Sequence, residues 1–182
     1  MNIQNFIKIC FVAILLISCN KEEEYIPMFA SAQQRTVKLS CVDKDGNDLL
    51  ADENFVDQLK IYGCLSKKEL DFQIKEIKKD GESQNYLYFA PDFPNTNDMQ
   101  YEGNNLAYGR SQFVMTINKQ KLTFSCFFRY TCSETPWLLG GSAIALKSIE
   151  YKYQIVTRNE DQSLFSDFPL CLEIDEGSIK IQ

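Results

Sequence analysis

Oxygen-bearing side chains gather in one short stretch of the sequence, around Gly46. Carboxylate and amide oxygens are the ligands that Ca²⁺ prefers, and four residues here could supply them: Asp43, Asp45, Asn47 and Asp48. If Gly46 took the sixth position of an EF-hand loop, however, the first position would fall on Cys41, which is not a calcium ligand. The same residues are typical of a β-turn, because Asp and Asn tolerate left-handed backbone and Gly adopts positive φ. The stretch therefore predicts a turn and no metal site, with calcium binding as the alternative.

The chain contains no histidine. This excludes Ser-His-Asp and Cys-His nucleophile systems, zinc sites with histidine ligands and pH switching by imidazole. A hydrolase would have to use carboxylates, as glycosidases do with two of them about 5 Å or about 6.5–9.5 Å apart. Asp and Glu are plentiful, but no pair is set apart by its context. We therefore predict no catalytic residues, no cofactor and no enzyme, and rank a carboxylate-based glycoside hydrolase behind the binding functions below.

Three aromatic residues in polar, loop-like segments are candidate ligand-binding residues: Trp137, Tyr101 and Tyr108. Trp137 is the single tryptophan and lies between Pro136 and the pair Gly140-Gly141. An exposed aromatic ring with a polar edge suits ligand contact, and here it would offer a platform for a sugar. Loops are also where β-domains commonly carry function. The alternative is that Trp137 caps the hydrophobic core.

The N-terminus suggests covalent chemistry of a different kind. Ile9–Ile17 is apolar throughout and follows Lys8. The run is shorter than the about 20 residues that cross a bilayer, and its length is typical of a signal peptide. It ends in Leu16-Ile17-Ser18-Cys19. This motif resembles the lipobox of bacterial lipoproteins, which signal peptidase II cleaves before the cysteine.

The resemblance implies that Cys19 becomes the first residue of the mature protein and carries fatty acids such as palmitate. Two or more acyl chains hold a protein stably at a membrane. The following residues, Asn20–Glu24, resemble the surface-export signal of Bacteroidota lipoproteins, although they also suit a plain solvated spacer. Val42–Leu50 is similar to the first strand and turn of uncharacterised Bacteroidota lipoproteins. The resemblance thus implies an outer-membrane location through the lipid on Cys19, with the domain facing the cell exterior.

Charge argues against nucleic acid as a partner. The chain has 19 basic and 25 acidic residues, a formal net charge of −6, and the signal peptide would remove Lys8 from the basic side. Phosphate backbones require basic clusters, and the sequence shows none.

After the loss of Cys10 and the lipidation of Cys19, five cysteines remain: Cys41, Cys64, Cys126, Cys132 and Cys171. An exported compartment permits disulfides, and five thiols allow at most two. A bridge between Cys126 and Cys132 is one hypothesis. Inert or structural thiols are the other expectation, because no cationic cluster surrounds them in the sequence.

Alternating apolar and polar residues predict short β-strands after residue 34. The predicted strands are Arg35–Val42, Leu59–Leu65, Leu70–Ile74, Tyr86–Phe89, the hairpin Phe113–Ile117 with Leu122–Tyr130, Ile144–Ile155, Leu170–Ile174 and Ile179–Gln182. Leu70–Ile74 also fits a helical stripe, and we prefer a strand. A change of parity at Ser148-Ile149 predicts a β-bulge within one long strand. Pro91–Asn105 is expected to be the longest irregular connection.

These elements predict an antiparallel β-sandwich, immunoglobulin-like or jelly-roll-like. We expect a signal peptide at 1–18, a lipidated acidic tether at 19–34 and a single domain at 35–182. The expected function is non-catalytic binding of a glycan or an envelope protein. The alternative is a structural, fimbria-like subunit of the cell envelope, for which Ile179–Gln182 would be the edge strand that accepts another chain.

Overall fold

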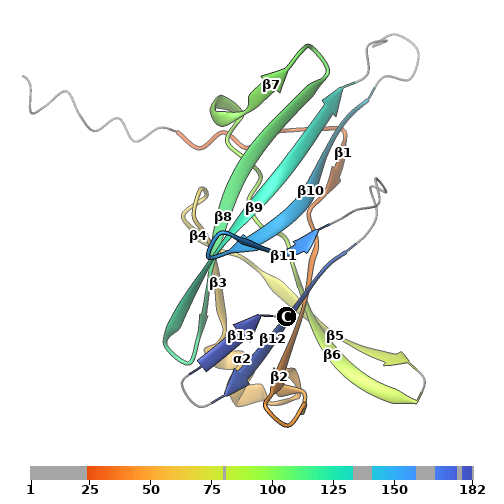
Figure 1. Ribbon diagram of the computed structural model, residues 1–182, viewed down its shortest axis with the longest axis vertical. Coiled ribbons are helices and arrows are strands. Elements are labelled where there is room, and N and C mark those ends of the chain that lie inside the picture. The colour runs from red at the N-terminus through yellow and green to blue at the C-terminus, as the bar shows by residue number, and fades with distance from the viewer. Residues whose placement is uncertain (1–23, 80, 133–140, 159–166, 176–177, 182) are drawn as a thin grey trace, which may run out of the picture.

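The computed structural model describes residues 24–79, 81–132, 141–158, 167–175 and 178–181. These residues form two β-sheets that pack face to face (Figure 1). The predicted all-β sandwich is therefore confirmed. Cys19, with the motif that resembles a lipobox, and Trp137 lie outside the described residues.

The first sheet has eight strands: β1 (Ala32–Gln34), β3 (Lys60–Gly63), β4 (Lys68–Glu69), β7 (Gln100–Glu102), β8 (Leu106–Ile117), β9 (Gln120–Cys132), β10 (Ser142–Tyr151) and β11 (Gln154–Arg158). The second has five: β2 (Val37–Asp43), β5 (Phe72–Lys79), β6 (Glu82–Phe89), β12 (Phe168–Asp175) and β13 (Ser178–Ile181). Short helical turns connect them: η1 (Leu49–Ala51), α2 (Glu53–Gln58) and η2 (Thr96–Asp98). Within the part of the chain described, no helix has the length and apolar character needed to cross a membrane.

Both sheets are mixed. The order of the first runs β1-β10-β9-β8-β3-β4, with β11 beside β10 and β7 beside β8, and the order of the second runs β13-β12-β2-β6-β5. Two pairs are parallel, β1 with β10 and β2 with β12, and each joins one of the first two strands to a strand from late in the chain. The other pairs are antiparallel, as the prediction had it.

The core lies between the sheets and follows from the alternation of the strands. In β8 and β9 every second side chain is buried, among them Phe113, Phe124 and Phe128. Phe113 meets Phe89 of the other sheet edge to face, with ring centroids 5.0 Å apart. Burial of one such side chain stabilises the fold by about 1.5–3 kcal/mol.

The N-terminal segment belongs to the domain from about residue 25 onward. Met28 and Ala30 are buried, the Met28 amide donates to the Pro94 carbonyl at 2.9 Å, and β1 lies beside β10. The prediction of a tether that reaches residue 34 is wrong for this stretch. Its apolar side chains are buried in the domain. The polar residues that precede them gave no sign of this burial.

A buried carboxylate connects two segments that are distant in the sequence. Asp92 is 4% exposed, and its Oδ2 accepts hydrogen bonds from the Leu65 amide at 3.2 Å and the Ser66 amide at 2.9 Å. Nearby, Arg35 donates to the Pro91 carbonyl at 2.7 Å, and its guanidinium lies 4.1 Å from the centre of the Phe93 ring. This network fixes residues 91–95 against the first sheet. The expected irregular connection Pro91–Asn105 is therefore partly buried, and it also contains η2 and β7.

The predicted long strand from Ile144 to Ile155 is two strands. The expected bulge is present, since the register with β9 shifts between Leu146 and Ser148. The chain then reverses at Lys152 and Tyr153, which have φ of 49° and 65°, and returns as β11. Two residues with positive φ are what a two-residue hairpin turn requires. The alternation of Tyr151, Tyr153 and Ile155 concealed this turn, because neither Gly nor Asn stands in it.

The remaining strand predictions near the edges are confirmed in outline. Phe72–Lys79 is a strand, so the helical alternative for Leu70–Ile74 does not apply. Ser178–Ile181 is an edge strand that pairs with β12, close to the expected Ile179–Gln182.

Candidate functional site

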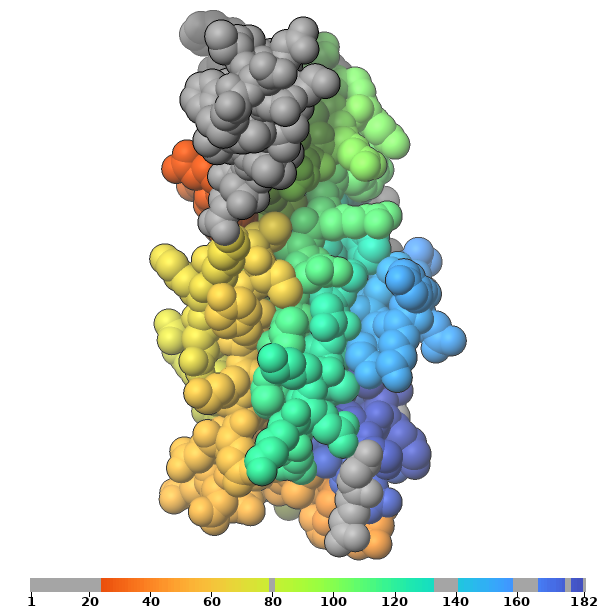
Figure 2. Space-filling model, turned by 90° about the vertical axis from the view of Figure 1, so that its left-hand side faces the viewer, coloured from red at the N-terminus to blue at the C-terminus, as the bar shows by residue number. Residues whose placement is uncertain are grey.

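The candidate site lies on the face of the eight-stranded sheet that is turned away from the core. We call this face the outer face. In β8 it presents Tyr108, Arg110 and Gln112, and in β9 it presents Thr123, Ser125, Phe127 and Arg129, which alternate with the buried side chains. The register places Gln112 opposite Ser125 and Ser125 opposite Glu150. Figure 2 shows part of this side of the molecule, with β3 and β4 in yellow, β8 and β9 in green and β11 in light blue side by side.

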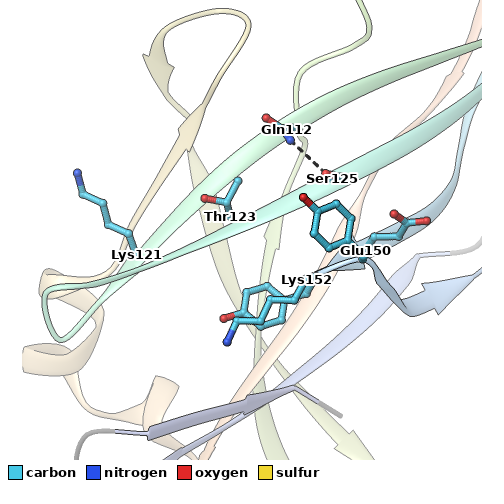
Figure 3. Close-up of a pocket in the computed structure, with 8 residues that line it drawn as sticks. Gln112, Lys121, Thr123, Ser125, Glu150 and Lys152 are labelled. Atoms are coloured by element: carbon cyan, nitrogen blue, oxygen red, sulfur yellow. Dashed lines mark hydrogen bonds between the residues drawn. The ribbon is translucent and has the colours of Figure 1, made fainter.

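The first hollow on this face has a volume of about 360 Å³, and we call it the tyrosine hollow. Its lining includes Gln112, Thr123, Ser125, Glu150, Tyr151 and Tyr153. Gln112 Nε2 donates to Ser125 Oγ at 3.2 Å, and Figure 3 shows this pair and Glu150 on neighbouring strands. Lys121 and Lys152 line it as well, so the hollow combines amide, hydroxyl, carboxylate and ammonium groups with two aromatic rings. Such a set can form hydrogen bonds to a polar ligand and stack against its apolar faces.

Tyr153 is the most exposed large aromatic residue of the described chain, at 98%. It occupies a hairpin position with φ of 65°, where Gly or Asn is favoured because other residues meet steric strain. Burial does not explain this residue, and backbone preference opposes it. Strained residues of this kind concentrate at functional sites.

The second hollow has a volume of about 450 Å³ and lies nearer β7; we call it the cationic hollow. Its lining includes Asp98, Gln100, Tyr108, Arg110, Phe127 and Lys147. The Arg110 guanidinium lies 4.5 Å from the centre of the Phe127 ring. The pKa of Lys147 is lowered, first by partial burial and second by the charge of nearby Arg129. Two cations, Arg110 and Lys147, thus line this hollow with Asp98, and Arg129 lies close to Lys147.

Of the sequence-predicted aromatic residues, Tyr108 and Tyr101 can be placed. Tyr108 is exposed and lines the cationic hollow, whereas Tyr101 lies on β7 in register with Ala107. Because Ala107 is buried and directly precedes Tyr108, the two tyrosines belong to opposite faces of the sheet. The structure does not bring them together into one platform.

The oxygen-rich turn at Asp43 uses its side chains internally. Both carboxylate oxygens of Asp43 accept hydrogen bonds from Asn47, at 2.8 and 2.7 Å, and these bonds lower the pKa of Asp43. The carboxylate of Asp48 accepts from the amides of Leu50 and Asn85. Among the described residues, no three His, Cys, Asp or Glu side chains gather as metal ligands. This arrangement is that of a β-turn followed by a capped 3₁₀-helix.

The cysteines show no sign of reactive chemistry. Cys41, Cys64, Cys126 and Cys171 are free thiols. Burial raises the pKa of Cys41 to about 12, with smaller contributions from Cys171 and Asp48, so this thiol stays neutral and weakly nucleophilic. The hypothesis of a Cys126–Cys132 bridge is wrong, because both residues lie in β9, about 20 Å apart along one extended strand.

Sequence patterns left most of this site undetected. Gln112, Ser125 and Glu150 are ordinary polar residues on the solvent side of strands, and only cross-strand register assembles them. The sequence placed Tyr153 within a single predicted strand, Ile144–Ile155. The signal that could have pointed to it is the aromatic-rich segment Tyr151-Lys152-Tyr153. No protein-family model, curated protein or solved structure matches this chain.

Proposed function

We propose that this protein is an outer-membrane lipoprotein, anchored through Cys19 and facing the cell exterior, that binds carbohydrate on its outer face without catalysis. The observation that carries the binding proposal is Tyr153. An aromatic ring that is 98% exposed is held in a backbone conformation that favours Gly, beside a row of hydrogen-bonding groups. Sugars offer both apolar faces and hydroxyls, and this combination matches them.

The orientation of the molecule is compatible with such a role. The segment that would lead from the lipid, Tyr25–Ala30, lies against residues 93–96 close to η2 and β7. The tyrosine hollow is lined by residues nearer the β8–β9 turn, and Figure 1 shows this turn at the other end of the sheet from β7. A lipid at Cys19 would then leave this hollow accessible.

The binding proposal is tested with Tyr153→Gly. This change removes the ring and relieves the backbone strain, so stability should stay equal or rise while affinity for a glycan array hit falls about 10-fold or more. Tyr101→Ala is the matched control, because it removes an exposed tyrosine from the opposite face. Isothermal titration calorimetry gives the affinity and thermal unfolding gives the stability. Unchanged affinity of Tyr153→Gly would overturn the proposal.

The anchoring proposal has its own test. Cys19→Ala should move the protein from the detergent phase to the aqueous phase and abolish incorporation of labelled palmitate. Protease treatment of whole cells should degrade the wild-type domain if it faces outward. A Cys19→Ala protein that still fractionates with the outer membrane would contradict the lipid anchor.

A structural, fimbria-like role is the second candidate, and one observation favours it. β13 is a short strand at the edge of the five-stranded sheet and could accept a strand from another chain. Light scattering would show concentration-dependent assembly, and Ile179→Pro should prevent it, since proline removes a backbone donor from the edge. A monomer at all concentrations would remove this candidate.

A further inference from the structure

The cations of the outer face come from three neighbouring strands. Arg110 lies on β8, Arg129 on β9 and Lys147 at the bulge of β10. The register sets Tyr108 opposite Arg129 and Arg110 opposite Phe127, so basic and aromatic side chains alternate across the sheet. The bulge supplies Lys147 as an extra residue at this point, which brings a second positive charge to the lining beside Arg110.

Ion pairs within the described part of the chain do not neutralise these charges. The described residues form ion pairs between Lys78 and Glu76 and between Lys180 and Glu173, and neither pair includes a cation of this hollow. Among the described residues, Asp98 is the one carboxylate in its lining. Arg129 Nε is buried and has no hydrogen-bond partner in the described structure. An unsatisfied buried donor is costly, and it leaves the charge of Arg129 next to the hollow without a partner at this atom.

The concentration of positive charge also runs against the composition of the chain. The formal net charge is −6, yet this hollow gathers Arg110, Lys147 and adjacent Arg129 against a single acid. Like charges placed together raise the energy of the free protein, and an anionic ligand lowers it again. Tyr108 and Phe127 flank the cations and could stack on the rings of a sugar.

We propose that the cationic hollow binds an acidic sugar, through its carboxylate or sulfate group, within the carbohydrate ligand of the outer face. This inference rests on the proposed function and names the ligand class. The cationic hollow provides the charge recognition, and the tyrosine hollow, which lies farther along β8 and β9, binds another part of the same glycan. Discrimination between acidic and neutral glycans then belongs to Arg110, Arg129 and Lys147.

The test uses matched polymers with the full mature domain. Polygalacturonate is compared with its neutral methyl ester, and dextran sulfate with dextran, so each pair differs in charge alone. We expect at least one charged polymer to bind about 10-fold or more tightly than its neutral partner, with an affinity that falls at high salt. Binding of polygalacturonate identifies the carboxylate as the recognised group, and binding of dextran sulfate identifies the sulfate.

Charge-removing variants locate the site. Arg110→Gln and Lys147→Gln should each weaken binding of the acidic polymer about 10-fold and reduce the dependence of that binding on salt. Lys44→Gln is the control, because it removes one charge from an exposed turn far along the sequence from either hollow. Circular dichroism and thermal unfolding confirm that the variants fold.

The outcomes separate this inference from the proposed function. Equal binding of charged and neutral partners, with a loss on Tyr153→Gly, overturns the inference and supports carbohydrate binding. Equal effects of Lys147→Gln and Lys44→Gln also overturn it. If single-stranded DNA binds as tightly as the acidic polymers, the hollow attracts any polyanion and acidic-sugar recognition is wrong. If none of these polymers binds, the acidic-sugar inference is overturned, and the glycan array with Tyr153→Gly decides the proposed function separately.

Discussion

At the scale of single residues, the contact between Gly63 and Asp92 leaves no room for a side chain. A Cβ at position 63 would lie 2.7 Å from Asp92 Cγ and Oδ1 and closer still to Oδ2. The same carboxylate accepts hydrogen bonds from the amides of Leu65 and Ser66, so it cannot move without leaving them unsatisfied. The glycine is thus required by a buried polar group and not by a turn.

Gly63→Ala should therefore lower the free energy of unfolding by about 2–4 kcal/mol, through overpacking and lost hydrogen bonds. Urea denaturation measures this loss. Gly103→Ala is the control, since a Cβ at position 103 would meet no atom within 4 Å and the φ of 72° is the sole obstacle. This change should lower the free energy of unfolding by about 1 kcal/mol. In a background with Asp92→Ala, Gly63→Ala should cost less than it does alone. An equal cost in both backgrounds would show that Asp92 is not the obstacle.

At the scale of elements, the two hairpins of the eight-stranded sheet have the same turn geometry, but only one of them could be predicted from the sequence. Asn118 and Lys119 have φ of 49° and 66°, and Lys152 and Tyr153 have nearly the same values. The β8–β9 turn was predicted because polar residues separate two alternating runs. The β10–β11 turn was not, because the aromatic alternation continues through it. Tyr153 thus holds a turn position that favours Gly, as Lys119 does in the other hairpin, and it differs from Lys119 in carrying a fully exposed aromatic ring.

The β8–β9 hairpin offers a test of this energetic argument. Lys119→Gly creates Asn-Gly, the favoured pair for such turns, and should raise the free energy of unfolding by about 0.5–1 kcal/mol. Lys44→Gly is the control: Lys44 is not among the residues with positive φ, so glycine there should bring no gain and a small loss. Thermal unfolding measures both. A destabilised Lys119→Gly would contradict the assigned turn geometry.

At the scale of the whole molecule, the N-terminal segment closes one end of the sandwich. Tyr25 donates to the Phe93 carbonyl at 3.0 Å, and burial raises the pKa of Tyr25 to about 12. Met28 and Ala30 are buried, and β1 extends the first sheet. Any tether to a membrane is therefore shorter than the polar N-terminal sequence suggests, and it ends near the β7 end of the outer face.

A chain that starts at Arg35 should consequently be less stable than one that starts at Glu24. The lost burial and hydrogen bonds amount to about 3–5 kcal/mol, which corresponds to a fall in Tm of roughly 10 °C. Scanning calorimetry of the two chains measures the difference. Equal Tm values would show that residues 24–34 contribute nothing to the folded domain.

The sequence by itself determined the class of fold and most of the strands. Alternation of period two in Val37–Cys41 and Phe113–Ile117 reflects a sheet with one buried side, and this local pattern survives in any sandwich. The bulge near Ser148 was predictable for the same reason, since one extra residue inverts the alternation. The motif at Cys19 that resembles a lipobox is likewise a local signal, and the lipidation that it predicts awaits the Cys19→Ala experiment.

The tertiary structure alone decided which polar residues come together. Gln112, Ser125 and Glu150 meet because three strands are aligned in register, and Arg110, Arg129 and Lys147 meet in the same way. Register between strands depends on packing over the whole core, which no window of sequence contains. The burial of Met28 and Asp92 was hidden for the same reason, because it depends on contacts between residues more than twenty positions apart.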